Sequence, residues 1–229
     1  MVNEFIIIIL FLILWILIHW GLKACAAAQE TDWGKPWLNY LDGLNRLFCK
    51  YYHGLRYIPL DLPAQGSALV MANHISGLDP LLMVAASRRP LRFIIAREQY
   101  ERFGLNWLFR AVGCIPVDRD RHPERALWRA LRALEAGEVV ALFPQGTIVL
   151  LHESRKLKRG GIWLAQRTQS PIYPVYISGI QGVGHIFRGV IFKSQANLVS
   201  HSPFYWQQDS DVDYLRALLE GRPAPPRQP

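Results

Sequence analysis

The sequence predicts an α/β domain, a largely parallel sheet flanked by helices, behind an N-terminal membrane helix. Short apolar runs of strand length alternate with helix-like segments from Tyr57 onward, which is the pattern of a sheet with helices packed on it. A chain of 229 residues is long enough to bury one sizeable core. We therefore expect a membrane anchor and linker at 1–34, one domain at 35–220, and a disordered Pro-rich tail at 221–229.

The expected anchor is an uncharged, almost wholly apolar run of eighteen residues from Phe5 to Leu22. At about 1.5 Å per residue it just reaches across a ~30 Å hydrocarbon core. A cleaved signal peptide is the alternative, since small residues follow at Ala24 to Ala28. The run is longer than a signal core of about 7–15 residues, and no Lys or Arg precedes it. The sequence thus favours a single transmembrane anchor.

Positive charge follows the anchor, beginning with Lys23 and Lys35, which places the body of the protein on the cytoplasmic face. The net charge of +8 and the pI of about 9.6 indicate anionic partners. Beside an anchor, anionic lipid explains this charge better than nucleic acid, for which the chain has no recognition motif. The three cysteines lack C-x-x-C spacing, so neither a disulfide framework nor a metal site is expected.

The segment from Pro36 to Tyr57 has apolar and aromatic residues mostly at three- and four-residue steps. This spacing predicts an amphipathic helix, weakened at Gly43 and Gly54. Its aromatic side is expected either to pack against the domain or to lie at the membrane interface.

The remaining elements follow from apolar runs and helix-like periodicity. We expect strands at 67–71, 91–96, 114–117, 138–143 and 172–178, with helices at 80–87, 123–136, 159–168 and 209–220. Helical turns broken at Gly104 are expected over 98–112, and one or two antiparallel strands over 186–205.

A histidine and a carboxylate stand at the end of the first of these strands. His74 and Asp79 flank a strand-to-helix turn, with Asp79 expected at the helix N-cap and Pro80 at the first helical position. Ser76 and Gly77 allow a tight turn, so the carboxylate can reach the imidazole and orient it as a general base. A turn hydrogen bond without catalytic meaning gives the same spacing, and other motifs must decide between them.

Two more blocks stand at strand ends, Gly113 to Arg119 and Leu142 to Ile148, and a further block, Ile172 to Val175, opens a strand. Ligands of open α/β sheets collect beyond the carboxyl ends of the strands, so the first two blocks and His74 are expected to share one mouth. In order and spacing the four blocks resemble the glycerolipid acyltransferase family, which includes the 1-acyl-sn-glycerol-3-phosphate acyltransferases. The family has N-H-x-x-x-x-D, G-x-I-x-V-D-R and F-P-E-G-T-R blocks and then a strand with an internal proline. The resemblance covers roughly residues 68–179.

The resemblance implies a membrane-anchored O-acyltransferase of phospholipid synthesis that moves a fatty acyl group from acyl-CoA or acyl carrier protein to a lysolipid hydroxyl. It implies His74 as the base and Asp79 as its orienting partner, without a metal or a cofactor. No G-x-S-x-G elbow or cysteine near His74 offers an acyl-enzyme nucleophile. The substrate-binding candidates are Asn73, Arg97, Arg119, Gln145, Gly146, Thr147, Lys158 and Arg159.

The third block departs from the family at two positions. Gln145 stands in place of glutamate, and Ile148 in place of the arginine that would pair with an acceptor phosphate. Either a cation such as Lys158 or Arg159 substitutes, or the acceptor is an unphosphorylated or glycosylated lipid. The basic run from Arg155 to Arg159 also fits a solvated or lipid-facing surface. A non-catalytic lipid-binding relative is a further alternative, against which the intact His74 and Asp79 argue.

Overall fold

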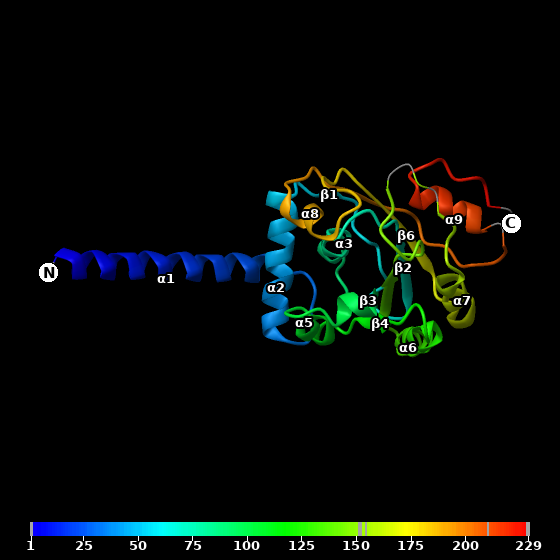
Figure 1. Ribbon diagram of the computed structural model, residues 1–229, viewed down its shortest axis with the longest axis horizontal. Helices are drawn as coiled ribbons and strands as arrows, with labels where there is room; N and C mark the ends of the chain where they lie inside the picture. The colour runs from blue at the N-terminus through cyan, green and yellow to red at the C-terminus, as the bar shows by residue number, and fades with distance from the viewer. Residues whose placement is uncertain (1, 151–152, 154, 210, 228–229) are drawn as a thin grey trace.

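The computed structural model describes residues 2–150, 153, 155–209 and 211–227, with side chains from residue 5 onward. It contains one seven-stranded sheet in the order β1-β7-β6-β2-β5-β3-β4, flanked by helices (Figure 1). Strands β6, β2, β5, β3 and β4 run parallel to one another, β7 is antiparallel to β6, and β1 is parallel to β7. The predicted α/β class with a largely parallel sheet is confirmed.

The strands are β1 Arg56–Tyr57, β2 Ala68–Ala72, β3 Leu91–Ala96, β4 Ile115–Val117, β5 Val139–Leu142, β6 Ile172–Ser178 and β7 Asn197–Ser200. The helices are α1 Val2–Ala28, α2 Pro36–Leu47, α3 Asp79–Ala86, α4 Arg97–Tyr100, α5 Asn106–Ala111, α6 Pro123–Glu135, α7 Arg159–Thr168, α8 Ile186–Ile191 and α9 Asp211–Leu219. A π-helical turn, η1 Phe48–Tyr52, continues α2.

The central strand β2 is buried along its whole length and divides the core in two. Leu69 and Met71 face one hydrophobic cluster, which α6, α7 and α9 cover, while Val70 and Ala72 face another that includes α3. This alternation is the period of a strand, and burial on both faces explains why β2 reads as an unbroken apolar run.

Helix α1 projects from one end of the domain and meets α2 at a close crossing (Figure 1). A side-chain carbon at Gly43 would collide with the backbone carbonyl of Cys25, so only glycine allows this approach. The most apolar eighteen-residue stretch of Phe5–Ala28 has a mean hydropathy of 2.8, and none of that stretch is buried. By length and composition this helix is able to cross a membrane.

A buried arginine attaches α2 to α3. Arg46 is 8% exposed; it pairs with Asp42 at 2.8 Å and donates to the backbone oxygens of Ala85 and Ser87. Asn45 adds a 2.9 Å bond to the Leu81 oxygen. These contacts fix the helix whose first residue is Asp79.

Two local expectations are wrong. Residues 186–191 form α8 instead of a strand, because Val190 and the buried Gly189 pack against the domain while Ile186, Phe187 and Ile191 stay exposed. Residues 56–57, which we expected to end the amphipathic helix, form the short strand β1, because the helical segment ends at Tyr52. In the tail, residues 222–227 have no helix or strand, and Arg227 pairs with Asp211 at 2.9 Å.

Candidate active site

His74 lies two residues after the end of β2, and its ring contacts Asp79 at the start of α3. His74 Nδ1 and Asp79 Oδ2 lie 2.7 Å apart. The Asp79 side chain is fully buried, whereas the His74 side chain is 19% exposed. A carboxylate only accepts hydrogen bonds, so the Nδ1 proton is donated to it and Nε2 carries the lone pair. The pair can therefore present a base to the solvent side.

Asp79 is held by the loop that precedes it. Oδ2 accepts from the backbone N–H groups of Ile75 at 2.7 Å and Ser76 at 2.9 Å, and Oδ1 accepts from the Ser76 hydroxyl at 3.2 Å. Asp79 was expected at the N-cap of its helix, but Leu78 is the cap and Asp79 is the first helical residue. Its carboxylate turns back to the loop because it binds N–H groups there and not those of α3.

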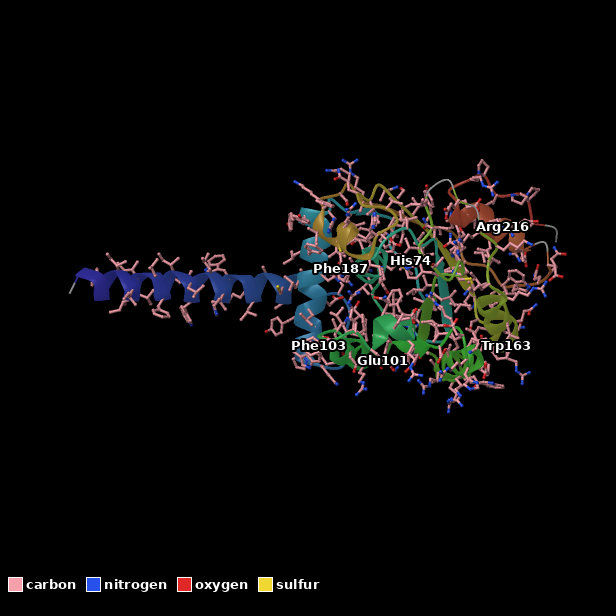
Figure 2. The ribbon with its side chains drawn as sticks, in the orientation of Figure 1. His74, Glu101, Phe103, Trp163, Phe187 and Arg216 are labelled. Carbon is pink, nitrogen blue, oxygen red and sulfur yellow. The ribbon has the colours of Figure 1, made fainter. Side chains whose placement is uncertain are left out.

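One face of the imidazole ring packs on Phe143, which follows β5. The two ring centroids lie 4.0 Å apart with an interplanar angle of 12°. Stacking and the Asp79 bond together fix both the plane and the rotation of the ring, with His74 lying inside the domain (Figure 2). Sequence reasoning identified Phe143 only as part of the third block, since nothing in the pattern shows ring stacking.

The Gln145 side chain holds the loop that follows β2 and contains His74. Its Oε1 accepts the His74 backbone N–H at 3.0 Å, and the Val149 N–H donates to the His74 oxygen at 2.8 Å. These bonds join the end of β2 to the turn after its parallel neighbour β5. The amide keeps the acceptor that a glutamate would offer at this position, so the exchange preserves the contact while removing a charge.

Gly146 and Lys158 lie in contact at the same turn. Gly146 has a φ of +75°, and a side-chain carbon there would lie 2.7 Å from Lys158 Nζ. The Lys158 backbone N–H donates to the Pro144 oxygen at 2.7 Å, which brings the lysine back over the block. Within the described residues its ammonium has no acidic partner, so it is free to bind an anion.

Asn73 lies behind the pair. Its amide donates to the Ile177 oxygen at 2.8 Å and accepts the Ile177 N–H at 2.7 Å. At 4% exposure and with both ends of the amide bound, it fastens β2 to β6 and does not face a substrate.

The other substrate-binding candidates lie at greater distances or face elsewhere. Arg97 is the first residue of α4, directly after β3, and pairs with Glu101 at 2.8 Å and Asp118 at 3.5 Å. Arg119 is exposed beyond β4, three strands from β2, or roughly 14 Å at ordinary strand spacing. Arg159 lines a hollow beside α7, and Thr147 is half-buried in the turn after β5.

Gly77 allows α8 to pack on the loop between β2 and α3. A side-chain carbon there would collide with the Ile186 backbone, and the Gly184 N–H donates to the Ile75 oxygen at 2.9 Å. The glycine was expected for tight turning, but its φ is not positive. The close approach of α8 is what requires it.

The two buried cysteines are not activated as nucleophiles. Burial raises the pKa of Cys49 and of Cys114 to about 12, so both thiols are protonated at neutral pH. Among the described residues, no group of three or more His, Cys, Asp or Glu side chains is placed to hold a metal ion.

The site is a His–Asp pair that follows parallel strands, with a glycine-containing turn beside it. Comparison with protein families identifies the class of this protein. Residues 51–178 match the family model described as Acyltransferase, which is more than half of the chain. The chain belongs to the acyltransferase family.

Particular relatives extend this match. A "Probable 1-acyl-sn-glycerol-3-phosphate acyltransferase" from Mycoplasma pneumoniae is 30% identical over 145 residues, 58% of this chain and 53% of the relative. A "Lyso-ornithine lipid O-acyltransferase" from Rhodobacter capsulatus is 30% identical over 114 residues, 49% of this chain and 41% of the relative. The chain spans about half the length of the curated relatives it matches.

The fold also matches a solved structure. The crystal structure of the 1-acyl-sn-glycerophosphate acyltransferase from Thermotoga maritima superposes with a TM-score of 0.65 at 21% identity, covering 80% of this chain and 78% of that one. At this identity the likeness concerns the fold alone.

Proposed function

We propose that this protein is a membrane-anchored O-acyltransferase that moves a fatty acyl group from an acyl thioester to the hydroxyl of a lysolipid. The observation that carries the proposal is the 2.7 Å contact of His74 Nδ1 with the buried Asp79, which leaves Nε2 available as a base. The family membership and the names of the relatives support the reaction type.

The geometry supports a direct transfer without an acyl-enzyme. The acceptor hydroxyl oxygen attacks the thioester carbonyl carbon while His74 Nε2 takes the hydroxyl proton. Asp79 stabilises the imidazolium that forms. The C–S bond then breaks, and the imidazolium returns the proton to the leaving thiolate.

The proposed acceptor is a phosphate-bearing lysolipid such as lysophosphatidic acid. Ile148 replaces the arginine of the family pattern, and Lys158 brings a positive charge back to the same turn. A lysine binds phosphate as a point charge and not as a planar fork. The substitution therefore keeps attraction for the phosphate and changes the geometry of its recognition.

A second acceptor class is an unphosphorylated lysolipid. The missing arginine at Ile148 and the lyso-ornithine lipid acyltransferase among the relatives favour it. The free ammonium of Lys158 favours the first class.

Membrane attachment is proposed from α1 and from the end of the domain that adjoins it. Helices α2, α5 and α8 lie at the end from which α1 leaves (Figure 1). They and the adjoining loop carry the exposed residues Trp37, Phe103, Trp107, Phe187 and Ile191. Aromatic side chains of this kind favour the membrane interface. The basic residues after α1 suit the cytoplasmic face.

The proposed function is tested by turnover of the full chain reconstituted in lipid, with labelled acyl-CoA or acyl carrier protein and a panel of lysolipids with and without phosphate. We expect transfer, with the phosphate-bearing acceptors preferred. Absence of transfer to every acceptor would contradict the proposal. Attachment is tested separately, because an intact α1 should keep the protein in the membrane through an alkaline carbonate wash.

A further inference from the structure

A hollow outside the His74 site lies between α7, the segment that leads into α9, and α9 itself. Its volume is about 480 Å³, which is within the usual range of small-molecule sites. The residues that line it are Lys156, Leu157, Arg159, Ile162, Trp163, Gln166, Trp206, Asp209, Val212 and Arg216.

The lining combines aromatic walls with positive charge. Trp163 and Trp206 contribute indole rings, and Lys156, Arg159 and Arg216 contribute three cations against the single carboxylate of Asp209. Arg216 is paired with Asp213 at 3.0 Å. Lys156 and Arg159 have no acidic partner in the part of the chain that the structure describes. This combination suits a ligand with a flat ring and negative charge.

Trp206 supplies a separate indication of a ligand. It is 7% exposed, and its indole N–H is buried without a hydrogen-bond partner among the described residues. A buried donor without a partner costs free energy, and an acceptor bound in the hollow that this ring lines would satisfy it after a small shift.

The position of the hollow relates it to the His74 site. Trp163 and Arg216 lie toward the end of the domain away from α1, and His74 lies between them and α1 (Figure 2). Arg159 lines the hollow, whereas its neighbour Lys158 contacts Gly146 at the mouth. Two consecutive residues, Lys158 and Arg159, therefore belong to the two sites. The hollow lies at the end of the domain opposite the proposed membrane surface.

We propose that this hollow binds the phosphorylated adenosine of coenzyme A, the water-soluble part of the acyl donor. The adenine packs against the indole rings, the phosphates bind Lys156 and Arg159, and the flexible arm with its thioester extends past Lys158 toward His74. This inference rests on the proposed function. It makes acyl-CoA the donor in preference to acyl carrier protein and assigns Arg159 to the donor and not to the lysolipid phosphate.

The experiment measures binding of adenosine 3′,5′-bisphosphate to the full chain in detergent by calorimetry. We expect saturable binding that Lys156→Gln and Arg159→Gln each weaken by about tenfold to a hundredfold, the loss of one charged hydrogen bond. Arg167→Gln, an exposed charge on the same helix outside the hollow, should leave the affinity unchanged. His74→Ala should bind as well as the wild type. In turnover, Arg159→Gln should raise the KM for acyl-CoA and leave the KM for acyl-pantetheine unchanged.

The inference would be overturned by absence of saturable binding, by equal affinity in the Arg159→Gln and Arg167→Gln variants, or by use of acyl carrier protein as the only donor. Inorganic phosphate serves as the probe for a simple anion site, and equal affinity for phosphate and for the bisphosphate would also contradict a nucleoside site. Binding without any acyl transfer by the wild type would instead reject the proposed function and leave this site standing.

Discussion

The Lys158 side chain lies directly over Gly146, a residue with φ +75° in the turn that follows β5. The backbone of Lys158 is tied to the same turn through the Pro144 oxygen. A cation that is thirteen residues from Gln145 in the sequence is thereby placed at the block that lacks its arginine. This contact is the basis of the phosphate-bearing acceptor proposed above.

Removing the Lys158 charge should impair use of a phosphate-bearing acceptor. We expect Lys158→Gln to lower kcat/KM for lysophosphatidic acid by about 1.5–3 kcal/mol, the value of one charged hydrogen bond. Lys158→Arg keeps the charge and should recover most of the activity. Transfer to an unphosphorylated lysolipid is the internal control. An equal loss on both acceptors would show that the lysine acts on the turn and not on the phosphate.

Replacing Gln145 separates its positioning role from its charge. Gln145→Met removes the acceptor of the His74 backbone N–H, and an unpaired donor in this half-buried turn should cost about 1–3 kcal/mol of stability and displace the ring. Gln145→Glu retains an acceptor, so its melting temperature and kcat should stay close to the wild-type values. A Met variant with wild-type kcat and melting temperature would show that the bond does not position His74.

Truncating Arg46 should destabilise the domain by loosening the attachment of α2 to α3. Arg46→Met leaves the Asp42 carboxylate buried without its partner and frees the oxygens at the end of α3. A broken buried pair of this kind costs about 3–5 kcal/mol in the free energy of unfolding. Chemical denaturation in detergent measures it, with Arg88→Met on an exposed arginine as the control. A loss below about 1 kcal/mol would contradict the role assigned to Arg46.

Acid should weaken the fold through two histidines. Burial lowers the pKa of His53 and of His201 below the ordinary histidine value. The unfolded chain therefore binds protons at these sites more readily, so their stabilising contribution is complete above about pH 6.5 and is lost as the pH falls below it. We expect His53→Phe, which keeps a ring beside Phe48 and Tyr52, to reduce the stability difference between pH 7.5 and 5.5. His122→Gln, at an exposed site, is the comparison; an undiminished difference in His53→Phe would contradict the assignment.

The fold was largely predictable because its central strands are buried on both faces. The apolar runs at β2, β5 and β6 have few alternatives once helices flank them. Residues 186–191 were misassigned because a short apolar run has no decisive period. In the helix Gly189 packs closely against Ser76, a tertiary contact that the short run itself does not reveal.

The site was predictable where spacing alone brings groups together. A separation of five positions between His74 and Asp79 suffices to form their contact, and the ordered blocks predict a shared mouth. The stacking on Phe143, the bond from His74 to Gln145 and the return of Lys158 depend on how β2, β5 and the 145–158 segment meet in space. The local sequence does not reveal such contacts. For the same reason Asn73 was expected to bind substrate, whereas its amide joins β2 to β6.

The central claim is that His74 is the base, held by Asp79. Asp79→Asn should reduce turnover by about 10²–10⁴-fold, because the amide can neither orient nor stabilise the imidazolium as a carboxylate does. The most direct measurement is the rate of acyl transfer by purified, folded His74→Ala from acyl thioester to lysolipid. We expect a rate at the background level; a rate near that of the wild type would contradict the assignment of His74 as the base.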